Sequence, residues 1–264
     1  MNALRWMSAL RRSIVLVALV VAGCETHQAL VEPNPMPALA RLAAADPDQA
    51  VKLGGGVDPA QIAGMLDTRV QLRFPTTLTV TRLTVDYYGG VGVNTLEAEE
   101  LNAWEKVVGN HPQITGVLPL SPVAVKYRTD INGRPVPLTM GDLREAAARQ
   151  QSGLILVYVQ AESQVENLNT AAALYWTGVG LFLSPGTDVE HKTVMQAVLV
   201  DTRSGMILGG ATGDSHRKRT SAAAFTQIQH DKLSKETPKE SLEELQVSSG
   251  RMIADVLANA RRVQ

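Results

Sequence analysis

The residues best suited by type to catalysis lie together near residue 214. Asp214, Ser215 and His216 are consecutive, and an acid, a hydroxyl and an imidazole form the catalytic triad of serine hydrolases. A triad is assembled in space rather than from neighbours along the chain, and the sequence has no G-x-S-x-G motif. We therefore predict no catalytic residue. The alternative is a hydrolase site assembled from residues distant in sequence, such as Asp201, Asp214 and His216.

Two further patterns could bind a cofactor or a metal ion. The glycine clusters at 89–92 and 209–213 lack both the Gly-Lys-Ser/Thr ending of a phosphate-binding loop and the full dinucleotide-binding spacing, so they indicate turns and close packing. Asp188, Glu190 and His191 carry metal-binding atoms, but no second pair of ligands follows at helical spacing. We expect a solvated loop there, and we predict neither a cofactor nor a metal ion.

The densest basic run is at 216–219. Arg217, Lys218 and Arg219 could contact anionic lipid head groups or an acidic protein partner, and the alternative is a solvated turn before a helix. The whole chain has 25 basic and 26 acidic residues and a formal net charge of −1. This balance gives no overall attraction to nucleic acid, so no nucleic-acid partner is expected.

The sequence contains a single cysteine, Cys24, and the residues before it are typical of a secretory leader. Arg5, Arg11 and Arg12 precede an apolar run at 13–22 that closes on small residues. A helix that spans a bilayer needs about 20 apolar residues, so this run is short for a permanent anchor. The alternative is an uncleaved signal anchor in which the cysteine is buried and inert.

The residues Val21, Ala22, Gly23 and Cys24 resemble the lipobox of bacterial lipoproteins. The resemblance implies cleavage before the cysteine, acylation of its thiol, and a mature chain that begins there. It also implies a lipid-anchored protein on the cell membrane or outer membrane, with its folded part in the periplasm or outside the cell. Aspartate at the next position can favour inner-membrane retention in that family, and because Glu25 stands there the choice of membrane stays open.

Removal of the leader would leave a chain without a thiol available for chemistry. The first 23 residues contain three arginines and no acidic residue, so their loss changes the formal net charge from −1 to −4. An acylated Cys24 excludes an internal disulfide, a thiolate zinc site and a cysteine nucleophile. Residues 24–57 contain four prolines and three consecutive glycines, which predicts a flexible tether with a possible short helix at 38–45. Residues 58–264 are predicted to form a single globular domain.

The pattern of apolar residues predicts an α/β domain of the α+β type, in which several helices pack on a mixed sheet. In the strand predicted at 76–88, the apolar residues before Arg82 would lie on one face and those after it on the other, which we interpret as a bulge near Arg82. A continuous apolar run at 154–160 indicates a central strand, and 193–202 with 206–212 indicates an antiparallel hairpin. Helices are expected at 94–109, 139–151, 220–233 and, as a C-terminal amphipathic helix, 238–262.

The most apolar internal run lies at 171–183 and is too short to span a bilayer, so it is predicted to be a buried strand. Residues 175–180 (YWTGVG), 184–186 and 195–201 resemble the signature segment of the rhombotarget lipoproteins. That family has a C-terminal sorting tail, whereas this chain ends in ARRVQ, so C-terminal processing is not expected. The family supplies no established chemistry, and the resemblance therefore implies a location.

From these patterns we predict a membrane-anchored lipoprotein of the bacterial envelope that acts as a non-catalytic interaction or assembly module. Its expected partners are the membrane, through acylated Cys24, and another envelope protein. The alternatives are the envelope hydrolase described above and a subunit of a secretion-type assembly, which only the general fold class suggests.

Overall fold

The structure is a computed structural model of the 264-residue chain. It describes residues 28–44, 72–85, 91–125, 132 and 136–263. Cys24, the leader and the start of the predicted globular domain at residue 58 lie outside these ranges. The α-helices are α2 (Met36–Ala44), α4 (Ala98–Val108), α5 (Met140–Arg149), α6 (Gly180–Leu183) and α7 (Thr226–Val263). Short 3-10 helices are η1 (Pro122–Ala124), η2 (Thr170–Thr177) and η3 (Ala223–Phe225).

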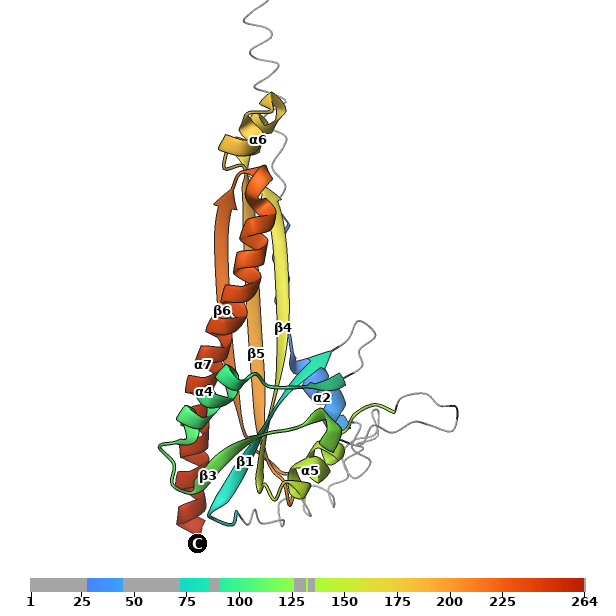
Figure 1. Cartoon of the computed structure of the whole chain (residues 1–264), viewed down its shortest axis with the longest axis vertical. Helices are drawn as coiled ribbons and strands as arrows, with labels where there is room; N and C mark the ends of the chain where they lie inside the picture. The colour runs from blue at the N-terminus through green and yellow to red at the C-terminus, as the bar shows by residue number, and fades with distance from the viewer. Residues whose placement is uncertain (1–27, 45–71, 86–90, 126–131, 133–135, 264) are drawn as a thin grey trace, which may run out of the picture. The chain divides into compact units, whose positions relative to one another are not determined.

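Among the described residues, six strands form one mixed sheet (Figure 1). They are β1 (Thr76–Val85), β2 (Val91–Asn94), β3 (Ile114–Pro119), β4 (Leu154–Leu168), β5 (Thr187–Asp201) and β6 (Ile207–Ser221). The order is β2-β1-β4-β5-β6, and β3 also pairs with β1. β1 is parallel to β3 and β4 and antiparallel to β2. A tight turn at 202–206 joins β5 to β6, which confirms the predicted mixed sheet with a hairpin.

The chain divides into two compact units. Of the described residues, unit 1 comprises those within 28–33, 162–193 and 215–239, and unit 2 comprises those within 34–161, 194–214 and 240–263. Strands β4, β5 and β6 and helix α7 each contribute residues to both units. The domain predicted from residue 58 onward therefore includes parts of both.

In unit 2 the sheet is covered on both faces. One core joins the strands to α4 and the C-terminal part of α7, and the other joins them to α2 and α5. In β4, Leu154, Leu156 and Tyr158 belong to the first core, whereas Ile155 and Val157 belong to the second. All five are at most 1% exposed. A strand covered on both faces has a continuous apolar sequence, and this confirms the predicted central strand.

The same two cores explain the apolar pattern of β1, where the predicted bulge at Arg82 is wrong. Leu78 and Val80 pack in the first core, and Leu83 packs in the second. The pairing of β1 with β4 runs without interruption from Leu78 to Leu83. The apolar phase changes because the strand contacts different cores along its length, while its pairing with β4 stays regular at Arg82. The register shift of β1 lies between Thr76 and Leu78, in its pairing with β3.

The helix predicted at 139–151 is confirmed as α5. The helix predicted at 94–109 is confirmed as α4 from Ala98 onward, whereas Asn94 belongs to β2. At the C-terminal end the helix prediction needs correction. The two helices expected at 220–233 and 238–262 form the single helix α7, which contains Pro238. Proline lacks the N–H needed for a helical hydrogen bond, but buried residues hold α7 on both sides of it. Thr237 and Ser241 are 0% exposed, and the Thr237 hydroxyl donates to the Leu233 carbonyl at 3.0 Å.

Helix α2 belongs to the region that the sequence predicted as a tether, and it packs in the second core of unit 2. Leu39 is 6% exposed and Leu42 is fully buried. The short helix expected near 38–45 is thus present and forms part of a folded unit. None of the helices in the described ranges has the length and hydrophobicity to cross a membrane.

A carboxylate lies within the first core of unit 2. Glu100 of α4 is 7% exposed, the Tyr158 hydroxyl donates to it, and Arg82 Nη1 lies 3.2 Å from its Oε2. Burial raises the pKa of Glu100, although the neighbouring Arg82 charge opposes this effect. The folded protein therefore holds the Glu100 proton more tightly than the unfolded chain does.

This difference predicts how Glu100→Gln changes stability with pH. In the native protein the contribution of Glu100 to the free energy of unfolding is fully present below about pH 4.5, the pKa of this carboxyl group in the unfolded chain. This contribution is lost as pH rises through the raised pKa of Glu100 in the folded protein. The variant cannot titrate, so its free energy of unfolding, relative to the native protein, should be higher at pH 7 than at pH 4. Urea denaturation at both values measures this, with exposed Glu99→Gln as control. If the free energies of unfolding of Glu100→Gln and the native protein differed by the same amount at both pH values, the expectation would be contradicted.

Candidate functional site

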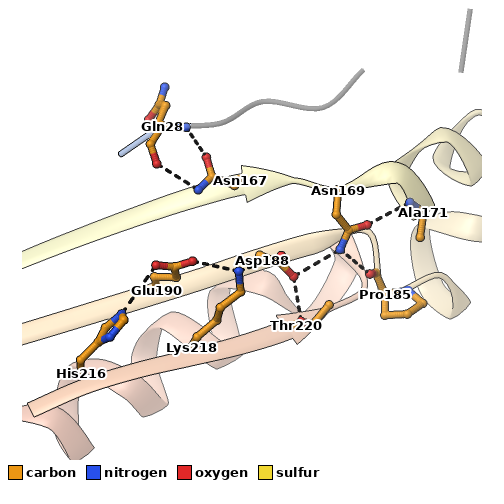
Figure 2. Close-up of polar contacts among 10 residues, drawn as sticks. All are labelled: Gln28, Asn167, Asn169, Ala171, Pro185, Asp188, Glu190, His216, Lys218 and Thr220. Atoms are coloured by element: carbon orange, nitrogen blue, oxygen red, sulfur yellow. Dashed lines mark hydrogen bonds and ion pairs between the residues drawn. The ribbon is translucent and has the colours of Figure 1, made fainter. Parts of the chain in front are cut away.

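The described chain begins at Gln28, four residues after Cys24, and this segment is held on the strands of unit 1. The Gln28 N–H donates to Asn167 Oδ1 at 2.6 Å, and Asn167 Nδ2 donates to the Gln28 carbonyl at 3.1 Å (Figure 2). Glu32 then pairs with Lys192 of β5 at 2.6 Å. Gln28 is therefore held beside the end of β4.

Directly after β4 the chain forms η2 and α6, so the strand predicted at 171–183 is wrong. Instead of being buried, most large apolar side chains here are exposed, with Trp176 87% and Leu183 77% accessible. Gly178 joins the two helices at φ +71°, a conformation that favours glycine and ends a regular strand. We define the apolar patch as the exposed large apolar side chains of η2, α6 and Val179 between them: Leu174, Trp176, Val179, Leu181, Phe182 and Leu183.

Side chains within unit 1 bind the backbone of this loop and fix its shape. Asn169 accepts a hydrogen bond from the Ala171 N–H at 2.9 Å and donates to the Pro185 carbonyl at 3.0 Å, as Figure 2 shows. The Ser184 hydroxyl donates to the Ala171 carbonyl at 2.7 Å. The Tyr175 hydroxyl lies 2.8 Å from the hydroxyl of Thr187. The loop thus presents apolar side chains on a backbone whose polar groups are paired locally.

Charged side chains line β5 and β6 in the same unit. Lys218 Nζ lies 3.2 Å from Asp188 Oδ2 and 2.9 Å from Glu190 Oε1, and His216 Nε2 lies 3.6 Å from Glu190 Oε2 (Figure 2). Hydrogen bonds to Glu190 and then Asp188 raise the pKa of Lys218. The Lys218 contacts join β6 to β5 by opposite charges across the sheet.

Asp188 also connects this charged row to the loop. Partial burial would raise its pKa, but hydrogen bonds from Thr220, Lys218 and Asn169 outweigh it and lower the pKa. Asn169 Nδ2 lies 3.2 Å from Asp188 Oδ1, and the same amide group binds Pro185. The carboxylate therefore stays ionised while it positions the first residue of the apolar loop.

The basic run lies on β6, and the turn expected there is wrong. Arg217, Lys218 and Arg219 all belong to the strand. Lys218 faces the two carboxylates of β5, and Arg219 Nη2 lies 2.7 Å from Glu236 Oε2. The contact of this run with an anionic partner stays a prediction, and these ion pairs neutralise part of the charge on which it depends.

The three potential metal ligands of β5 are divided between two faces of the strand. They lie on a strand and not in the expected loop. Asp188 and Glu190 face Lys218, whereas His191 is 2% exposed and its Nε2 lies 3.0 Å from Gln164 Oε1. Burial lowers the pKa of His191. Within the ranges that the structure describes, no group of three or more His, Cys, Asp or Glu residues could hold a metal ion.

The residues of the alternative hydrolase site each have other partners. The Asp201 carboxylate accepts hydrogen bonds from the N–H groups of Arg203 and Ser204 at 3.2 and 3.1 Å, so it shapes the hairpin turn. Asp214 uses its N–H to bind Glu244 at 2.9 Å, and His216 faces Glu190 in the charged row. The Asp201 carboxylate and the His216 imidazole thus have structural partners, whereas the Asp214 contact involves its backbone N–H alone.

A cleft of about 460 Å³ lies in unit 2, with Asp201, Arg73 and Ser152 among its lining residues. Ser152 is the hydroxyl to consider as a nucleophile there. Its Oγ lies 2.9 Å from the Thr77 carbonyl and 2.8 Å from the Leu154 carbonyl. The hydroxyl therefore binds the backbone and is not directed at an acid or base in the cleft.

Sequence reasoning missed both the exposure of the apolar loop and the attachment of Gln28 beside it. One available signal was the absence of any charged residue between Glu166 and Asp188 in a stretch that also contains several glycines. No protein-family model matches the chain, and no curated protein matches it. Function is therefore inferred from the residues and contacts described above.

Proposed function

We propose that the protein is a lipid-anchored lipoprotein of a bacterial envelope, acylated on Cys24, that acts as a non-catalytic interaction or assembly module. The observation that carries this proposal is the Val-Ala-Gly-Cys segment at 21–24, which follows three arginines and an apolar run. Each buried acyl CH₂ contributes about 0.8 kcal/mol to membrane binding, and more than one acyl chain is needed for a stable anchor. Several chains on one cysteine would meet that need.

The attachment of Gln28 is compatible with an anchor close to the folded protein. Four residue steps separate Gln28 from Cys24, and an extended chain covers at most about 3.5 Å per residue. An acylated cysteine would therefore lie within roughly 14 Å of Gln28. On this proposal unit 1 stays near the membrane and does not move freely at the end of a long tether.

The contacts of the candidate catalytic residues support a module in preference to an enzyme. Asp201 shapes a turn, the Ser152 hydroxyl binds backbone carbonyls, and His216 lies in a row of ion pairs. Acid–base catalysis by such groups would need one of them to be directed at a reacting group in the cleft. The exposed features of unit 1 instead suit binding, and an envelope protein remains the proposed second partner.

The test is the mass of the N-terminal peptide of protein extracted from cell membranes. The proposal expects a peptide that begins at Cys24 and carries the added mass of several acyl chains. Extraction should require detergent, because the anchor is hydrophobic. A peptide that begins at Met1 and contains an unmodified thiol would refute the proposal and favour the uncleaved signal anchor.

A further inference from the structure

We propose that the apolar patch inserts into the interfacial layer of the same membrane that holds Cys24, as a second and non-covalent membrane contact. This inference rests on the proposed function, because the lipid anchor decides which surface the patch meets. The patch consists of the six exposed side chains between Leu174 and Leu183 defined above. Exposed apolar surface of this kind usually marks an interaction site.

The position of Gln28, four residues after Cys24, indicates lipid as the occupant. Gln28 binds Asn167 through two hydrogen bonds, and Asn169, two residues further along, binds the first turn of η2. The apolar loop therefore starts close to the residue at which Gln28 is attached. Because Cys24 lies within about 14 Å of Gln28, a bilayer that accepts its acyl chains would lie next to the apolar patch.

The composition of the loop is suited to the interfacial layer. No charged residue occurs between Glu166 and Asp188, so insertion would not bury a charge. Trp176 is 87%, Phe182 59% and Leu183 77% exposed. Tryptophan is enriched where the acyl chains meet the head groups, and phenylalanine and leucine are common on the buried face of interfacial segments.

Many backbone N–H and C=O groups of the loop are also hydrogen-bonded, which suits a medium with little water. Unpaired N–H and C=O groups are costly in lipid, and here helical turns and nearby side chains pair many of them. The Thr177 hydroxyl accepts from the Gly180 N–H at 3.0 Å and donates to the Leu174 carbonyl at 2.7 Å. Gly180 packs so closely that an added Cβ would lie 1.9 Å from the Leu174 oxygen. This close packing holds the start of α6 against the backbone of η2.

The nearby charges indicate that insertion depends on apolar contact rather than on anionic lipid. Lys218 is paired with both Asp188 and Glu190, and Lys192 is paired with Glu32. These cations have carboxylate partners within unit 1. We therefore expect the contact in neutral phosphatidylcholine vesicles, with little dependence on salt, because neither the uncharged loop nor the lipid carries a net charge for salt to screen.

The experiment uses acylated protein, purified from membranes and reconstituted in phosphatidylcholine vesicles, with Trp176 as the probe. After removal of the leader, the mature chain contains two tryptophans, Trp104 and Trp176, and Trp104 is 0% exposed. Insertion should shift Trp176 emission to shorter wavelength and allow quenching by lipids brominated near the head-group end of the acyl chains. The Trp176→Phe variant should lose the quenched signal, since only the buried Trp104 remains.

A paired substitution tests the surface itself. Phe182→Asp with Leu183→Asp should abolish the quenching of Trp176, since two carboxylates would have to enter the membrane, while circular dichroism should show an unchanged fold. Val247→Asp is the matched control, because Val247 is an exposed apolar residue of α7 at 56% accessibility. That variant should retain the quenching.

The outcomes separate this inference from the proposed function. Protein that carries acyl chains and sediments with vesicles, but whose Trp176 emission stays that of a water-exposed indole, would overturn the inference and leave the anchor intact. A Trp176 shielded by self-association, shown by a dimer mass and unchanged by brominated lipid, would overturn it in favour of a second copy. Protein without acyl chains that fails to sediment would refute the proposed function.

Discussion

Replacing Cys24 with serine is expected to abolish acylation completely and to leave the leader attached. The thiolate is the reactive form of cysteine, with an ordinary pKa near 8.5, and a serine hydroxyl at the same position is a much weaker nucleophile. Cys24 is the sole cysteine in the sequence, so no other thiol can accept the lipid. In the lipoproteins that the lipobox resembles, cleavage follows acylation, and the variant should therefore accumulate as the full-length precursor.

Growth with labelled palmitate and the mass of the purified chain measure both effects. The native protein should incorporate label and lack its first 23 residues, while Cys24→Ser should show no label and retain them. Glu25→Gln is the control, since it alters the neighbouring residue and keeps the thiol. Labelled palmitate on the serine variant would place the acyl group on another residue and disprove the assignment of Cys24.

Elements with a strong local pattern could be predicted from the sequence. The hairpin of β5 and β6 follows from two extended runs around the turn at 202–206, and α5 follows from helical spacing after Thr139. Thr139 accepts a hydrogen bond from the Asp142 N–H at 3.1 Å, and the Asp142 carboxylate accepts one from the Thr139 N–H at 2.9 Å. These signals depend on residues close in sequence, so tertiary packing did not alter them.

The errors arose where the environment of a residue depends on distant parts of the chain. The run at 171–183 is apolar, and its hydrophobicity alone indicated a buried strand. In the structure, helical turns and nearby side chains pair the backbone of this loop locally, and Trp176 and Leu183 are exposed. The basic run indicated a solvated turn because the sequence does not show that Lys218 lies opposite Asp188 and Glu190. Such cross-strand pairs exist only once the register of the sheet is set.

The helix boundary predicted at Pro238 was wrong for a similar reason. A proline removes one helical hydrogen bond and disfavours continuation of a helix, so two helices were the expected result. The buried hydroxyls on either side have partners that the sequence does not reveal, with Thr193 3.0 Å from Thr237 and the Gly213 carbonyl 2.9 Å from Ser241. Packing of α7 within each unit thus overcomes a local preference against helix.

The close approach of β6 and α7 in unit 2 predicts a large loss of stability for Gly213→Ala. A Cβ on Gly213 would lie 2.2 Å from the Ser241 carbonyl oxygen and 2.3 Å from the Leu245 nitrogen. Both are backbone atoms of α7 and cannot rotate away, so the helix itself must shift. That shift would disturb Leu245, which is 0% exposed in the first core. Overpacking of this kind typically costs about 1–3 kcal/mol in the free energy of unfolding.

Gly210→Ala is the matched control on the same strand, because its Cβ would meet only the Ala197 carbonyl oxygen, at 3.5 Å. That is an ordinary contact, and its effect should stay within about 0.5 kcal/mol. Urea denaturation followed by Trp104 fluorescence measures both variants in a Trp176→Phe background, since Trp104 lies in the same core as Leu245. Equal urea midpoints for the two alanine variants would show that α7 shifts without a loss in the free energy of unfolding. The close contact with Gly213 would then contribute nothing to the stability of unit 2.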